Sequence, residues 1–297
     1  MSLLKDNVNE GPGSLRKQLS SGFVECAGVF NGISALQAQE AGFKALYLSG
    51  SSIAACMGLP DLSFTTLSEV AAETRKITAI TRPPLIVDAD TGFGETGNVT
   101  RTVIELEHAG ASAIHIEDQV LPKKCGHLPG KEVVTQDDMV RKVRAAVAAR
   151  KNPDFMIIAR TDSYAIEGFD GAVARAKAYL DAGADMIFPE ALDSADVFRD
   201  FAKAVDGKLM ANMTEFGKSP LMSARELEAI GYSLVIFPLT AFRSSLLNVK
   251  NVYHRLKKYG TQRDFVDSLM TRDEFYGLID YHGYEKDDQD IFRGKEK

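Results

Sequence analysis

The stretch EHAGASAIHIED, residues 107–118, ends a helix and begins a strand with almost no linker. Gly110 is suited to close the helix in a left-handed conformation, and Ile114 and Ile116 belong to an apolar run that suits a buried strand. The same handover recurs in EAGFKALYLSG (40–50), DAGADMIFPE (181–190) and EAIGYSLVIFPL (228–239). This repetition is typical of folds in which strands and helices alternate along the chain.

Apolar runs mark the strands of the predicted sheet. Most of them lack strict alternation, as expected for strands covered on both faces. The runs are 23–31, 45–50, 85–90, 113–118, 155–162, 185–190, 209–214 and 234–239, with helical patterns between them that include 98–110, 135–150 and 168–183. Eight such strands predict an α/β protein with a closed (β/α)8 TIM barrel rather than a six-stranded open sheet.

The predicted organisation is one domain over residues 1–297. Residues 241–297 supply the last barrel helix, 241–260, and then a helical extension through 262–281 with a charged tail. We expect this extension to pack either on its own barrel or on a neighbouring subunit. A second segment that a minimal barrel does not require is the Pro-, Gly- and Lys-rich stretch 119–134. It has the length and composition of a functional lid.

Composition excludes several classes of protein. The formal net charge is −6, which argues against a general nucleic-acid binder. The sequence shows no signal segment and no apolar run near 18 residues, so we expect a cytoplasmic protein that does not enter a membrane. Three cysteines without CxxC spacing favour neither a disulfide framework nor a zinc ribbon.

Polar residues follow the predicted strands at their carboxyl ends. In a barrel of this kind those ends meet around one mouth, where the chemistry takes place. The residues at these ends are Ser49, Gly50, Ser51, Asp88, Asp90, Glu117, Asp118, Arg160, Asp162, Glu190, Asn212, Thr214 and Arg243.

Asp88 and Asp90 are two residues apart on a predicted strand, so their carboxylates are expected on the same face. Two neighbouring carboxylates repel unless a cation lies between them, and oxygen ligands suit Mg²⁺. The alternative is that one aspartate caps the next helix or pairs with an arginine. Glu117 on the neighbouring strand favours the metal site.

Cys125 lies in KKCGH, residues 123–127, within the predicted lid. Lys123, Lys124 and His127 favour the thiolate form, and the long loop would let the sulfur reach the barrel mouth. A lone cysteine beside a histidine on a loop is otherwise most often without a role. His115 is interpreted as a hydrogen-bonded strand histidine rather than a ligand.

The stretch GFGETG, residues 92–97, matches the dinucleotide fingerprint GxGxxG. It follows the third strand instead of the first, and Asp88 and Asp90 beside it would repel a pyrophosphate. The eightfold layout also leaves no dinucleotide-binding half to contain it. We therefore do not expect a nicotinamide cofactor.

Seven phrases, in order, resemble the isocitrate lyase/phosphoenolpyruvate mutase superfamily. They are GLPD (58–61), DADTGFG (88–94), HIEDQ (115–119), KKCGHLPGK (123–131), ARTD (159–162), FPEA (188–191) and ANMTEFGKSP (211–220). The cysteine of KKCGH is typical of the lyase branch. Later phrases, such as GTQRDFVDSLMTRDEFY (260–276) and DYHGYE (280–285), are most similar to lyases that act on 2-methylisocitrate.

The resemblance implies a barrel whose last helix is exchanged between subunits of a homotetramer. It implies Mg²⁺, replaceable by Mn²⁺, bound directly by Asp88 and Asp90 and through water by Asp61 and Glu117. The implied catalytic residues are Cys125, His127, Arg160 and Glu190. Contacts to a tricarboxylate substrate are implied for Ser49, Gly50, Ser51, Cys125, Gly126, Arg160, Glu190, Asn212, Thr214, Arg243 and Arg272.

The implied reaction cleaves the C2–C3 bond of 2-methylisocitrate into pyruvate and succinate, a step of propionate catabolism through the methylcitrate cycle. Arg160 and Arg243 would hold the departing carboxylate, and Cys125 would protonate its carbon. Glu190 and a hydroxide held by the cation remain alternative bases.

Other substrates and one other class remain open. Isocitrate, 2,3-dimethylmalate and oxaloacetate are alternative substrates, because one methyl group contributes only about 1–3 kcal/mol of discrimination. Tyr47, Phe188 and Pro238 could form a methyl pocket or belong to the core. A non-catalytic barrel with Cys125 as a redox sensor is the alternative of another class.

Overall fold

The computed structural model describes residues 8–292. Its strands are β1 Val24–Val29, β2 Ala45–Leu48, β3 Leu85–Asp88, β4 Ala113–Glu117, β5 Met156–Thr161, β6 Met186–Pro189, β7 Met210–Asn212 and β8 Leu234–Phe237. The paired neighbours are parallel, in the order β6-β5-β4-β3-β2-β1-β8-β7. A parallel bridge between Ile187 and Leu209 joins β6 to β7, so the ring closes and the predicted (β/α)8 barrel is confirmed.

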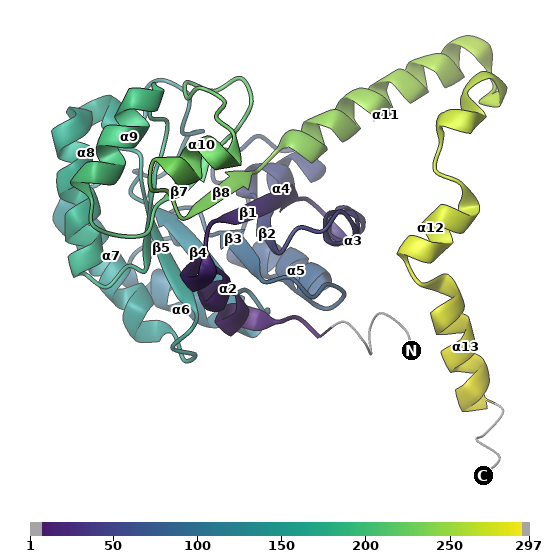
Figure 1. The fold of residues 1–297 in the computed structure, drawn as a ribbon, viewed down its shortest axis with the longest axis horizontal. Helices are drawn as coiled ribbons and strands as arrows, with labels where there is room; N and C mark the ends of the chain where they lie inside the picture. Colours follow the sequence, from purple (N-terminus) through teal and green to yellow (C-terminus); the bar gives the residue numbers. More distant parts are fainter. Residues whose placement is uncertain (1–7, 293–297) are drawn as a thin grey trace.

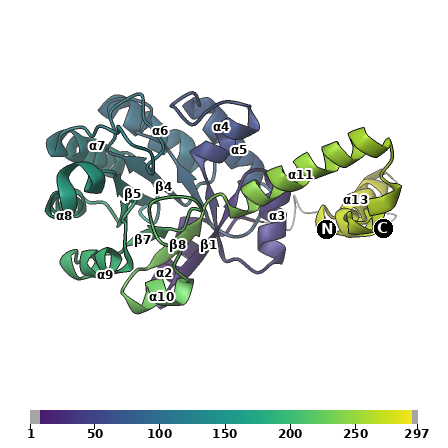
Figure 2. The same ribbon diagram turned by 90° about the horizontal axis from the view of Figure 1, so that it is seen from above.

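Helices surround the ring of strands (Figures 1 and 2). Within residues 8–292, no helix combines the length and the apolar character that a membrane crossing requires. The elements are α2 Gly11–Ser21, α3 Gly32–Glu40, α4 Gly50–Cys56, α5 Leu67–Thr78, α6 Thr96–His108, α7 Gln136–Ala149, α8 Tyr164–Asp181, α9 Ala195–Ala204, α10 Ala224–Ala229, α11 Thr240–Tyr259, the 3₁₀ helix η1 Arg263–Ser268, α12 Arg272–Leu278 and α13 Tyr281–Phe292.

The predicted short connections from helix to strand, each with a glycine at the end of the helix, are confirmed. Their four glycines all adopt positive φ, with values of +93° at Gly42, +89° at Gly110, +102° at Gly183 and +100° at Gly231. An L side chain is strained in this region, whereas glycine is not. The chain therefore leaves each of these helices and enters the next strand within a few residues.

The core has two layers, one inside the barrel and one between strands and helices. Side chains alternate along the strands, so Ile114 and Ile116 of β4 pack toward the helices while Ala113 packs inside. Leu15 and Leu19 of α2 join the interior layer and close the amino-terminal end of the barrel. The opposite end is left for His115, Glu117 and the other polar residues that follow the strands.

Two helix starts show how local sequence sets the boundaries. The Thr135 side chain accepts a hydrogen bond from the Asp138 N–H at 3.2 Å, the capping contact expected at the start of α7. The predicted helical stretch 168–183 lies within α8, which begins earlier, at Tyr164. Gly168 has φ +75° and marks a kink between two helical segments of α8.

The extension after the barrel is helical, but it is not one helix. The predicted helical stretch 262–281 divides into η1 and α12, because Leu269 is extended and Thr271 caps a new helix. Figure 1 shows α11 projecting from the barrel and α12 and α13 lying away from it. On α11, Leu246, Leu247 and Tyr253 are 53%, 61% and 68% exposed, so this helix leaves apolar surface uncovered in the single chain.

Candidate active site

A cavity of about 340 Å³ lies at the carboxyl ends of the strands. Most of the predicted site residues line it: Ser49, Ser51, Asp61, Asp88, Cys125, Gly126, His127, Arg160, Glu190, Asn212, Thr214 and Arg243. Residues that were not predicted for the site also line it: Lys123, Lys124, Leu128, Glu215, Phe216, Gly217 and Leu239. Four predicted residues are not part of the lining, namely Gly50, Asp90, Glu117 and Arg272.

Three of those four lie directly behind the cavity wall. The Gly50 N–H donates to Asp88 Oδ2 at 3.0 Å, so it holds a carboxylate. Glu117 is fully buried next to Arg160, and Asp90 lies beside Asp88. The prediction that Asp88 and Asp90 share one strand was wrong: β3 ends at Asp88, and Asp90 has φ +49°. The turn nevertheless keeps both carboxylates together.

Lys123 lies among the carboxylates of Asp61, Asp88 and Asp90. Lys123 Nζ lies 2.6 Å from Asp61 Oδ1 and 2.6 Å from Asp90 Oδ1, and its side chain is buried. Burial opposes the charge of Asp88, but His115, Lys123 and Arg160 outweigh it and hold its pKa at about 2. Burial and the charge of Asp88 raise the pKa of Asp90 to about 6, although Lys123 opposes this shift. Asp88 is therefore the firmly ionised member of the pair.

The donor set fits a small divalent cation. Within residues 8–292, no three carboxylate, imidazole or thiol groups converge as a complete metal shell. Mg²⁺ does not require one, because it is commonly bound by one or two carboxylates together with water and substrate oxygens. Glu117 Oε1 is buried without a hydrogen-bond partner, and carboxylate oxygens are the donors that such an ion prefers.

The loop that carries Cys125 lies over the cavity and is fixed at several points. The Gln119 side chain bonds the backbone of Lys124 in both directions, at 2.9 and 3.0 Å. His127 Nδ1 accepts from the Lys218 N–H at 2.9 Å, and its Nε2 lies 2.7 Å from Glu190 Oε1. Cys125 itself is half-buried and lines the cavity.

The basic residues expected to favour a Cys125 thiolate all have other partners. Lys123 pairs with the aspartates, His127 with Glu190, and Lys124 Nζ donates to the Gly130 carbonyl at 2.6 Å. The thiolate stays a prediction. The geometry instead indicates that these basic residues fix the loop over the mouth.

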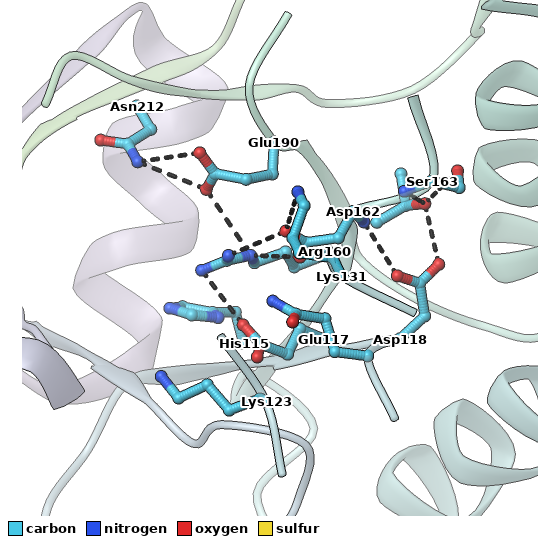
Figure 3. A network of polar contacts seen from close by, with 12 residues as sticks. His115, Glu117, Asp118, Lys123, Lys131, Arg160, Asp162, Ser163, Glu190 and Asn212 are labelled. Atoms are coloured by element: carbon cyan, nitrogen blue, oxygen red, sulfur yellow. Dashed lines mark hydrogen bonds and ion pairs between the residues drawn. The ribbon is translucent and has the colours of Figure 1, made fainter. Parts of the chain in front are cut away.

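Arg160 joins the buried carboxylates at the centre of the mouth (Figure 3). Its Nε lies 2.8 Å from Asp162 Oδ2, and its Nη1 lies 3.1 Å from Glu117 Oε2. The guanidinium also lies over the Phe188 ring at 5.2 Å, so Phe188 supports Arg160 from the core and does not line the cavity. Tyr47 and Pro238 do line it.

Glu190 is held as an anion. Burial opposes its charge, but Arg160 and His127 lower its pKa below the usual value. The Asn212 Nδ2 lies 3.3 Å from both of its carboxylate oxygens. A carboxylate held in this way is a weak general base.

Tyr47 and His115 form a pair below the cavity that the sequence did not reveal. Tyr47 Oη lies 2.8 Å from His115 Nε2, and the rings stack at 5.8 Å. Burial lowers the pKa of His115 to about 4, so the ring is neutral at neutral pH. The prediction of a hydrogen-bonded strand histidine is confirmed. His115 lies two residues before Glu117 on the same strand, so both side chains leave the same face. This position was the signal that could have pointed to the pair.

The two remaining arginines differ in their relation to the cavity. Arg243 lines it, over the Phe216 ring at 5.3 Å and 3.6 Å from Glu215 Oε2. Arg272 begins α12 and is exposed, and α12 lies away from the mouth of its own chain (Figure 1). The structure of one chain therefore does not bring Arg272 to the site.

Gly126 provides a test of the loop's close packing. A Cβ at this position would meet Arg160 Nη2 and Glu190 Cγ, each at 2.5 Å. We expect Gly126→Ala to lift the loop and displace Cys125, lowering kcat by about 100-fold, the scale of a misplacement near 1 Å. Steady-state kinetics measure this. Gly97→Ala, where an added Cβ meets nothing within 4 Å, is the control. Equal activity of the two variants would contradict the close packing.

The closed parallel barrel, with a polar mouth under a cysteine-bearing loop, defines the class: a (β/α)8-barrel enzyme. The family model for phosphoenolpyruvate phosphomutase matches residues 16–257. The chain belongs to the isocitrate lyase/phosphoenolpyruvate mutase superfamily.

Individual relatives agree with this assignment. The chain is 52% identical to a 2-methylisocitrate lyase of Aeropyrum pernix, over 100% of this chain and 96% of that protein. It is 46% identical to a 2-methylisocitrate lyase of Escherichia coli K12, over 91% and 92%. The crystal structure of a 2,3-dimethylmalate lyase of the same superfamily superposes with a TM-score of 0.89 at 37% identity, covering 94% of this chain and 95% of that one.

Proposed function

We propose that this enzyme is a carbon–carbon lyase that cleaves 2-methylisocitrate into pyruvate and succinate. Two curated relatives of that name align over most of the chain, at 52% and 46% identity. The observation that carries the proposal is that Cys125, Arg160 and Asp88 line one cavity of about 340 Å³, a size that suits a small tricarboxylate. This cleavage needs three groups: an acid, here Cys125 on its loop; a guanidinium, here Arg160; and a carboxylate that can bind a cation, here Asp88.

Asp88 and Asp90 would hold a divalent cation directly, with Asp61 and Glu117 reaching it through water. We propose Mg²⁺, with Mn²⁺ as a substitute, because the donors are oxygens and few in number. When bound, the cation supplies positive charge beside the α-hydroxy acid, which makes removal of the hydroxyl proton easier. Lys123 lies against Asp61 and Asp90, and so adds a fixed positive charge to the same group.

Other groups of the chain would stabilise the negative charge that develops during cleavage. As the C2–C3 bond breaks, its electrons pass into a carboxylate and make a dianion. Arg160 and Arg243 line the cavity and would hold that charge. Ser49, Ser51, Gly126, Asn212 and Thr214 would orient the substrate through hydrogen bonds, whereas Gly50 holds Asp88 in place.

Cys125 would then protonate the dianion at carbon while the loop keeps water out. His127 and Glu190, 2.7 Å apart, would hold the loop in place over the cavity. The lowered pKa of Glu190 makes it a weak candidate for the base that removes the hydroxyl proton. We propose that Glu190 mainly positions Arg160, Asn212 and the loop.

The defining experiment is an assay with Mg²⁺ and 2-methylisocitrate in which lactate dehydrogenase detects the pyruvate formed. The same assay with 2,3-dimethylmalate tests a substrate that would also yield a detectable 2-oxo acid. Isocitrate and oxaloacetate need separate detection of glyoxylate and oxalate. We expect the highest kcat/KM with 2-methylisocitrate. A higher value with any of the other three acids would overturn the proposed substrate but not the assignment to the superfamily.

We also propose that α11 is exchanged between subunits of a homotetramer. The exposed Leu246, Leu247 and Tyr253 of α11 are the kind of apolar surface that a second subunit buries. Arg272 would then reach the substrate of a neighbouring subunit, which accounts for its distance from the mouth of its own chain.

A further inference from the structure

We infer that Lys131 is a positioning residue that fixes Arg160 through Asp162. The inference rests on the proposed function, because Arg160 is the group proposed to hold the departing carboxylate. Lys131 belongs to the returning segment of the loop that carries Cys125, so this contact links the position of the loop to the placement of the arginine.

Asp162 is the shared partner of both cations (Figure 3). Its Oδ1 lies 2.8 Å from Lys131 Nζ and 3.2 Å from Arg160 Nη2, and its Oδ2 lies 2.8 Å from Arg160 Nε. The Asp162 N–H donates to Asp118 Oδ1 at 2.8 Å, which fixes its backbone. Asp162 therefore grips one edge of the guanidinium while Lys131 holds the carboxylate in place.

The loop thus reaches Arg160 directly at its tip and through Asp162 at its stem. At its tip, Gly126 packs so closely that an added Cβ would meet Arg160 Nη2 at 2.5 Å. At its stem, Val120 N–H donates to the Glu132 carbonyl and Val134 N–H to the Asp118 carbonyl, at 2.9 and 2.8 Å. Lys131 lies at the end of this stem, and its side chain is 2% exposed.

The surrounding negative charge explains why a positive charge at Lys131 would be useful. Arg160 faces three buried carboxylates, those of Glu117, Asp162 and Glu190. A second positive charge in contact with Asp162 reduces the negative charge around Arg160, which would otherwise oppose the extra negative charge that develops on the departing carboxylate. Without Lys131 the buried Asp162 would keep only Arg160 as its cation, and Arg160 would be drawn toward the protein and away from the ligand.

Lys131→Met tests this role, since methionine keeps the length of the side chain and removes the ammonium. We expect kcat with 2-methylisocitrate to fall by about 10- to 100-fold, the scale of losing one hydrogen bond to a charged group, with a much smaller change in KM. Lys131→Arg should restore most of the lost kcat. Lys131→Gln, which keeps a donor, replaces K131M if that variant yields little folded protein.

Arg150→Met is the matched control, because Arg150 pairs with Asp185 at 2.6 Å near the start of β5, at the other end of the barrel. A purely structural ion pair predicts equal kinetic behaviour of K131M and R150M at equal thermal stability, and that outcome would overturn the inference. So would a normal kcat in K131M, or a loss confined to KM.

A second measurement keeps this test separate from the proposed reaction. Oxalate is a planar dianion, so it imitates the charge that develops during cleavage rather than the substrate. Its binding in the presence of Mg²⁺, followed by calorimetry, therefore reports the anion site without catalysis. We expect K131M to bind oxalate more weakly than R150M and its loop amides to exchange hydrogen faster. If the wild-type protein does not cleave 2-methylisocitrate, the proposed function fails while this comparison still decides the role of Lys131. Equal oxalate affinity and equal exchange would overturn it.

Discussion

Cys125→Ser is expected to lower kcat by about 100- to 10,000-fold, the contribution of a well-placed general acid. The hydroxyl has nearly the size of the thiol, so the loop should still close, with the Gln119 contacts to Lys124 and the His127–Glu190 pair intact. Serine is a far weaker acid than cysteine, and the carbanion-like product would therefore wait much longer for its proton. Stopped-flow kinetics of pyruvate release measure the effect.

Cys56→Ser is the control, because Cys56 is exposed at the end of α4, outside the cavity lining. It should leave kcat unchanged. Substrate binding to the Cys125→Ser protein, measured by calorimetry, should stay within a few-fold of wild type. Near-normal turnover in that variant would eliminate the cysteine as the acid, and a loss of binding instead of turnover would make it a substrate ligand.

Removal of divalent cations with EDTA is expected to abolish turnover, and added Mg²⁺ is expected to restore it. The physical reason is the density of buried carboxylates around Asp88, whose pKa of about 2 keeps it ionised at any working pH. A trianionic substrate would be repelled from this group without a cation to offset the charge. Mn²⁺ should restore part of the activity.

Metal binding can be measured without turnover. Titration of the metal-free protein with Mn²⁺, followed by electron paramagnetic resonance, should show one site per chain. Asp88→Asn should lose that site, whereas Asp185→Asn, which changes an ion pair at the other end of the barrel, should keep it. Full activity after exhaustive chelation would exclude a required metal site. Unchanged Mn²⁺ binding in Asp88→Asn would show that the metal is bound at another place.

The fold could be predicted from the sequence because its signals are local. Each glycine handover lies within a few residues of its helix and strand, and the apolar runs show burial directly. The α2 closure of the barrel was not predicted, since Leu15 and Leu19 become interpretable only when the open end is known. The break between η1 and α12 was missed because a cap at Thr271 competes with an otherwise helical pattern.

The candidate site was predicted in composition but not in arrangement. Strand ends and the family resemblance supplied most of the residues that line the cavity. The pairing of Lys123 with Asp90 and of Arg160 with Glu117 could not be predicted, because each pair joins positions far apart in the chain and depends on the distance between strands. Lys131 is the last residue of the motif KKCGHLPGK, and nothing in the sequence indicated that its partner is Asp162, 31 positions further along the chain.

Among the described residues, Leu15 and Leu19 pack into the barrel interior at its amino-terminal end, and the cavity opens at the opposite end, beside Cys125. Both products of a cleavage would then leave through this one opening, and we expect them to leave in sequence, with the product bound deeper leaving last. Turnover would become sensitive to solvent viscosity if product release is slower than bond breaking.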